Sequence, residues 1–171
     1  MSGGAGLTYM VGRAVREAAE LDRLGTFIFG AHAVDLEIDE GTGQVHLIKV
    51  WAAHDVGRAV NPSDVIGQIV GGVAQGIGYA LIEELVRHDG QNANPTLADH
   101  KIPGALDLPA IEPIIIEQPE PSGPLGAKGV GEPPIICVAP AVGNAIREAT
   151  GHRLRQLPFT PERVDSALNQ R

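Results

Sequence analysis

One acidic residue, Glu132, lies between residues that fix the course of the backbone. It stands between three glycines and two prolines in the segment 126–134, GAKGVGEPP, and apolar residues follow at once. Glycine frees the backbone and proline restrains it, so the position of this carboxylate is tightly determined. Apolar surroundings predict a poorly solvated carboxylate with a raised pKa, which is the property that a general base needs near neutral pH. The structural alternative is that Glu132 pairs with Lys128 or caps a turn.

A second group of polar residues occupies the segment 54–62, HDVGRAVNP, directly after a predicted strand. Active-site residues are common at such junctions between a strand and a loop. The structural interpretation is an ion pair between Asp55 and Arg58, with a turn contact from Asn61. A metal site at His54 is not favoured, because no second ligand stands nearby at a spacing typical of metal sites.

The segment 66–86 has apolar residues at helical spacing, interrupted by four glycines: Gly71, Gly72, Gly76 and Gly78. An interior glycine costs about 1 kcal/mol relative to alanine. The glycines therefore predict close packing, either against another backbone or against a ligand. They superficially match a dinucleotide-binding turn, but such a turn joins a strand to a helix, whereas these glycines lie within the helical pattern. The segment thus argues against a nicotinamide-dependent enzyme.

The single cysteine, Cys137, lies in an apolar run with no histidine beside it. A buried cysteine usually behaves as a small apolar residue, so core packing is favoured over a nucleophile. One cysteine also cannot form an internal disulfide or a multi-cysteine metal site. Any iron–sulfur cluster must therefore belong to a partner.

Size and charge restrict the class of protein. The chain has 171 residues, 43% of them hydrophobic, and a formal net charge of −8. This predicts one globular domain over residues 1–171 and argues against binding to nucleic acid, which needs a positive surface. No apolar run approaches the roughly 20 residues that span a bilayer, and no signal-peptide pattern stands at the N-terminus. We therefore expect a soluble, cytoplasmic protein without a membrane anchor.

The elements that must position these residues include both helices and strands. Helical spacing and cap residues predict helices, and alternating or continuous apolar runs predict strands. A loop is expected at 88–105 and a turn-rich segment at 119–134. The predicted elements are a helix at 8–24, a hairpin of strands at 34–38 and 44–52, a helix at 66–86, a strand at 111–117, a helix from Pro140 to Gly151, and a short helix opening at Thr160. The expected fold is α+β, a mixed sheet packed by amphipathic helices.

Four ordered motifs together resemble one family. They are HDVGRAVNP (54–62), GQIVGGVAQGIGYALIEEL (67–85), KIPGALDLP (101–109) and GPLGAKGVGEPP (123–134). In this order they resemble the molybdopterin-binding subunits of the xanthine dehydrogenase and aldehyde oxidase family. The resemblance runs over residues 30–164, and residues 1–29 form an atypical N-terminal helix segment. It implies one lobe of a molybdenum-cofactor-binding domain.

The resemblance also implies roles for individual residues. Glu132 corresponds to the general base, which takes the proton of a hydroxide bound to molybdenum, and Gln75 to a glutamine beside the cofactor. The backbone of Gly131 is expected near the metal. The remaining residues expected to bind or support the cofactor are Gly76, Lys128 and Gly129. The cofactor would be molybdopterin or its cytosine dinucleotide form, with [2Fe–2S] and FAD on partner subunits.

The chain is several times shorter than the subunits it resembles, and other cofactor loops of the family have no counterpart in it. We therefore expect a C-terminal part of the molybdenum subunit of an oxidative hydroxylase, inactive alone, whose partners are the rest of that subunit, an iron–sulfur subunit and an FAD subunit. The alternative is a non-catalytic, cofactor-free remnant that acts as a structural or interaction module. Incomplete packing should leave apolar surface exposed, which predicts self-association. The sequence does not indicate the substrate.

Overall fold

The computed structural model describes residues 27–169, so the helix expected at 8–24 lies outside the described residues. The described elements alternate between strands and helices, and the expected α+β class is confirmed. In chain order they are β1 (Gly30–Ile38), β2 (Val45–Asp55), α2 (Pro62–Leu81), β3 (Arg87–His88), β4 (Gln91–Asn92), α3 (Leu97–His100), β5 (Ala110–Ile116), the 3-10 turn η2 (Pro124–Gly126), α4 (Pro133–Ile136), α5 (Val138–Thr150) and α6 (Pro161–Leu168).

A mixed three-stranded sheet in the order β1–β2–β5 forms one layer. Strands β1 and β2 form the expected hairpin, and β5 lies parallel to β2 on its other side. The turn of the hairpin is closed by the Asp39 carboxylate, which accepts hydrogen bonds from the backbone N–H groups of Gly41 at 2.8 Å and Thr42 at 3.1 Å. Because β2 is the central strand, its C-terminal end lies beside both neighbouring strands.

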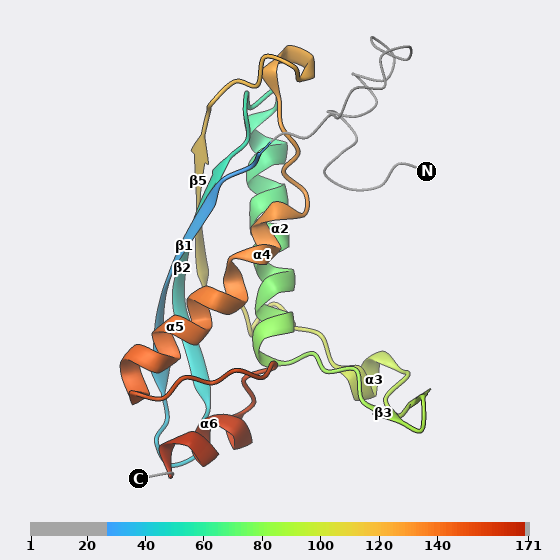
Figure 1. The fold of residues 1–171 in the computed structure, drawn as a ribbon, viewed down its shortest axis with the longest axis vertical. Coiled ribbons are helices and arrows are strands. Elements are labelled where there is room, and N and C mark those ends of the chain that lie inside the picture. The colour runs from blue at the N-terminus through green and yellow to red at the C-terminus, as the bar shows by residue number, and fades with distance from the viewer. Residues whose placement is uncertain (1–26, 170–171) are drawn as a thin grey trace.

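Helices α2, α4 and α5 cover one face of this sheet (Figure 1). The alternating apolar residues of the strands meet the apolar faces of the helices there, and burying these side chains is the main stabilising contribution. The fully buried core residues include Val50, Ala52, Ile69, Val73, Ile77, Val138 and Val142. Among residues 27–169, no element covers the other face of the sheet, where Ile114 and Ile116 stay exposed.

Two helices begin earlier than expected. Helix α2 starts at Pro62 because proline suits the first helical position, and it ends at Leu81, before the expected end. Helix α5 starts at Val138, directly after the short helix α4, and proline is tolerated at 140 because it lies in the first turn. Its end is as expected, since Gly151 takes a left-handed φ of 77°. The N-cap expected at Thr160 is confirmed, because its side chain accepts a hydrogen bond from the Arg163 N–H.

The segment 82–109 was expected to be a loop over most of its length, yet it contains three short elements, β3, β4 and α3. Figure 1 shows α3 and β3 lying away from the sheet. The segment leaves apolar side chains in solvent, including Leu97 and Leu106. Within the described part of the chain, no helix is long and apolar enough to cross a bilayer.

Candidate functional site

Three of the four motifs meet where β2 ends and α2 begins. The loop after β2 is joined to the segment 126–128 by two backbone hydrogen bonds, from Lys128 N to Val56 O at 2.9 Å and from Arg58 N to Gly126 O at 2.8 Å. Gly57 has a positive φ of 68°, and a Cβ there would lie 2.4 Å from Gly126 O. A pocket of about 230 Å³ lies between these two segments and the first turns of α2.

A buried ion pair joins the same two segments. The Lys128 Nζ lies 2.5 Å from Asp55 Oδ2, and the two side chains are only 6% and 7% exposed. The other carboxylate oxygen of Asp55 accepts a hydrogen bond from the Gly57 N–H at 3.0 Å. The expected Asp55–Arg58 ion pair is therefore wrong. The suggested pairing of Lys128 with Glu132 is wrong as well, because the Lys128 ammonium group pairs with Asp55.

Glu132 stands at the N-cap position of α4, with a helical backbone conformation and no capping hydrogen bond from its side chain. The side chain is exposed, so the prediction of a poorly solvated carboxylate is wrong for this chain, and Ile136 after it is exposed as well. Within residues 27–169 the carboxylate has no hydrogen-bond or ion-pair partner. The backbone around it is nevertheless fixed, since Pro134 is buried against α2.

The glycines of α2 divide between two faces of the helix. A Cβ on Gly72 would lie 2.8 Å from Pro134 Cβ, and one on Gly76 would lie 2.5 Å from Val138 Cγ2. These two glycines let α2 approach α4 and α5 closely, which is the first of the two kinds of packing expected. Gly71 is different, because a Cβ there would meet no atom within 4 Å. All of them lie inside the helix, which confirms that they form no dinucleotide-binding turn.

The structure brings Gln75 and Glu132 to neighbouring elements. Gln75 is exposed on α2, one turn after Gly71. Gly131 lies at the contact between α2 and α4, where its carbonyl oxygen is 3.6 Å from the Cβ position of Gly72. Gly129 is buried. The cofactor contacts of these residues, and those of Gly76 and Lys128, stay predictions.

Open space and exposed polar groups occur on both elements. A Cβ on Gly67 or Gly71 of α2 would meet no atom within 4 Å. The exposed Gln75 amide and the exposed Glu132 carboxylate have free hydrogen-bonding capacity within the described residues. Among residues 27–169 no set of three metal-ligating side chains gathers in one place.

A buried pair of histidines is a feature that sequence reasoning missed. His32 Nε2 and His54 Nε2 lie 2.7 Å apart, and neither Nδ1 has a hydrogen-bond partner in the described structure. Burial lowers the pKa of His32 to about 4, with a further contribution from His54, and burial lowers the pKa of His54 too. The sequence signal that could have found this pair is the alternation of inward- and outward-facing residues along the two strands of the hairpin, which places both histidines on the inward face.

Cys137 lies at the junction of α4 and α5, with its Sγ 3.7 Å from Gly30 O. The side chain is half-buried, and this burial raises the pKa of the thiol. A raised pKa keeps the thiol protonated and unreactive. The structure therefore supports the interpretation of Cys137 as a packing residue.

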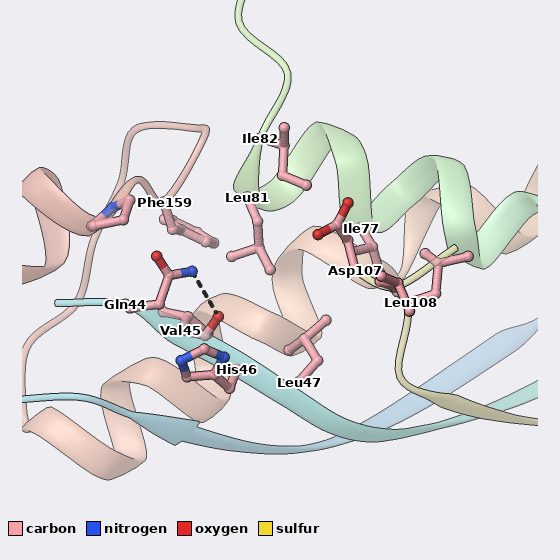
Figure 2. Close-up of a pocket in the computed structure, with 12 residues that line it drawn as sticks. Gln44, Val45, His46, Leu47, Ile77, Leu81, Ile82, Asp107, Leu108 and Phe159 are labelled. Carbon is pink, nitrogen blue, oxygen red and sulfur yellow. Dashed lines mark hydrogen bonds between the residues drawn. The ribbon is translucent and has the colours of Figure 1, made fainter. Parts of the chain in front are cut away.

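The fourth motif, 101–109, contacts only the C-terminal part of α2, where a Cβ on Gly78 would lie 2.8 Å from Pro103 Cδ. Its residues Leu106, Asp107 and Leu108 line a pocket of about 330 Å³ at the C-terminal end of α2. Figure 2 shows this pocket, with the Gln44 side chain directed toward Leu81 and Phe159. It lies at the other end of α2 from the pocket beside Lys128, and none of the predicted site residues lines it.

Comparison with known proteins identifies the family. Residues 5–109 match the molybdopterin cofactor-binding domain family. The chain is 42% identical over 138 residues to the xanthine dehydrogenase molybdenum-binding subunit of Escherichia coli O157:H7, covering 80% of this chain and 18% of that protein. It thus spans about a fifth of this relative's length.

Solved structures give the same result. The fold matches quinoline 2-oxidoreductase from Pseudomonas putida 86 with a TM-score of 0.77 and 38% identity, over 82% of this chain and 18% of that one. It matches the aldehyde oxidoreductase of Desulfovibrio gigas with a TM-score of 0.76 and 36% identity, over 82% of this chain and 15% of that one. The chain therefore belongs to the xanthine dehydrogenase and aldehyde oxidoreductase family of molybdopterin-binding subunits.

Proposed function

We propose that this chain forms one wall of the molybdenum-cofactor site in a hydroxylase that is assembled from several polypeptides. The observation that carries the proposal is the pair of exposed polar groups on the neighbouring elements α2 and α4, the Gln75 amide and the unpaired Glu132 carboxylate, with open space above Gly71 one turn before Gln75. Gln75 would hold the cofactor by hydrogen bonds from its amide. The bound cofactor would supply the oxygen-transfer and electron-accepting chemistry.

Glu132 would act as the general base in this reaction. Its carboxylate is free of partners within the described residues, so it can accept a proton from a group placed beside it. The two prolines after it hold its backbone in place, which limits the positions that the carboxylate can take. The exposure of Glu132 in this chain means that other parts of the assembly must exclude water from it, because a raised pKa requires burial.

The rest of the site would come from partner chains. Since the chain spans about a fifth of a relative's length, we propose that the remaining portion of the molybdenum subunit closes the site. Electrons would leave through an iron–sulfur subunit and an FAD subunit. The chain would act in the cytoplasm as one domain, with the cofactor in its molybdopterin or cytosine dinucleotide form.

A second candidate is a non-catalytic, cofactor-free remnant of the family. The observation in its favour is that the described residues leave Gly71, Gln75 and Glu132 uncovered. Metal and pterin analysis of protein purified from its native host separates the two. Molybdenum and pterin that co-purify with partner chains support the enzyme, whereas a metal-free chain without partners contradicts it.

A further inference from the structure

We infer that Asp55 and Lys128 together are positioning residues for Glu132, and that Lys128 does not contact the cofactor. The inference rests on the proposed function of Glu132 and explains how its loop is held. Lys128 lies four residues before Glu132, and its ammonium is occupied by a buried carboxylate from the end of β2. An amine that is 6% exposed and paired at 2.5 Å has no room for a second large anionic partner.

The segment that carries Glu132 has an anchor on each side. After Glu132, Pro134 packs against Gly72 of α2. Before Glu132, the backbone of Lys128 donates to Val56 O, and its side chain pairs with Asp55. Between Lys128 and Glu132, residues 129–132 donate no backbone hydrogen bond within the described structure. The course of these residues therefore depends on the two anchors and on the packing of Val130 against the core.

Both members of the pair are held by the rigid part of the fold. Asp55 is the last residue of the central strand, where it pairs with Ile116 of β5. Its second oxygen accepts from the Gly57 N–H, and Gly57 is the residue that contacts Gly126 and Lys128 closely. A buried pair of this kind contributes specificity of position more than net stability, because desolvation of the charges offsets much of their attraction.

Amide hydrogen exchange in the full 171-residue chain tests the inference without activity. Two amides report on the loop: Lys128 N, bonded to Val56 O, and Ile135 N, bonded to the carbonyl of Glu132 itself. The exchange rate of each amide is divided by that of the buried Ile146 amide in α5, because a loss of global stability raises both rates equally. Asp55→Asn keeps the acceptor for Gly57 and removes the charge, and Lys128→Met keeps the aliphatic chain. The matched control is Lys49→Met, which breaks the exposed Lys49–Glu112 pair on the same sheet.

Each single variant should raise the exchange rate of the Lys128 and Ile135 amides, relative to that of Ile146, about tenfold. The double variant should raise it by the same factor of about ten, because the two residues act as one unit. The control should stay within about twofold. Unchanged reporters, an effect of about a hundredfold in the double variant, or an equal effect of the control would each overturn the inference. So would a loss of molybdenum in Lys128→Met protein from the native host with the loop unchanged. If Glu132 proves not to be the base, the exchange result still stands, so the two failures are distinguishable.

Discussion

At the scale of single residues, Glu132 and the histidine pair are ionisable groups in opposite environments. Glu132 is exposed and unpaired within residues 27–169, although its backbone is fixed on both sides. His54 is buried, and it pairs with the half-buried His32. A carboxylate left free at a rigid position is suited to exchange protons, whereas a buried imidazole pair is suited to hold a hairpin together.

The histidine pair predicts a dependence of stability on pH. The pKa of His32 is lowered from 6.5 to about 4 in the folded state, so the folded chain binds fewer protons than the unfolded chain between these values. Stability is then fully present above about pH 6.5 and falls as the pH drops toward 4, by about 1–2 kcal/mol, because solvent screens the half-buried imidazole. Urea denaturation across this range measures it. His32→Gln should flatten the profile, and the exposed control His46→Gln should not. An unchanged slope in His32→Gln would refute the assignment.

At the scale of elements, α2 uses its glycines in two different ways. Gly76 permits the close approach of α5, whereas Gly71 faces open space. The glycines in the sequence could predict that α2 packs closely against a neighbour. Their positions around the helix could not predict which of them lie at that contact.

Matched alanine substitutions separate the two uses. Gly71→Ala should stabilise the chain by about 0.5–1 kcal/mol, because alanine restricts the unfolded backbone and meets no neighbour. Gly76→Ala should destabilise it by about 1–3 kcal/mol, because the new methyl group would overlap Val138. Urea denaturation of both variants gives the comparison. Equal effects of the two substitutions would show that α2 does not pack as described.

Much of the element order could be predicted from the sequence, because local patterns determine it. The alternation in the hairpin, the cap at Thr160 and the glycine at 151 each act over a few residues. The partner of Lys128 could not be predicted, since Asp55 is 73 residues away and only the parallel pairing of β2 with β5 brings the segments together. The prediction that Glu132 is buried was wrong for a similar reason. Local apolar residues do not decide which side of a loop faces the core.

At the scale of the whole molecule, the sheet is covered on one face only. The other face carries Ile114 and Ile116, which are 40% and 48% exposed, next to Phe29 at 68%. Contiguous apolar surface of this kind marks a contact site in a soluble protein. The expected exposure of apolar surface is therefore confirmed, and self-association stays a prediction.

We predict that the isolated chain self-associates through this face. Sedimentation velocity should show species larger than the monomer at micromolar concentration. The variant Ile114→Thr/Ile116→Thr should shift the distribution toward monomer, since threonine keeps the β-branched shape and lowers the apolar area. The control Leu97→Thr, on the segment away from the sheet, should leave it unchanged. A purely monomeric wild-type chain would contradict the prediction.

The central claim is that Glu132 accepts the proton in an assembled molybdenum enzyme, and Glu132→Gln tests it most directly. The variant keeps the size and the exposed position of the side chain and removes only its basicity. In the complete assembly, with molybdenum content measured beside turnover of the substrate that the wild-type enzyme oxidises, we predict full metal occupancy and a kcat lowered by at least about a hundredfold. Turnover equal to wild type at equal molybdenum content would contradict the account.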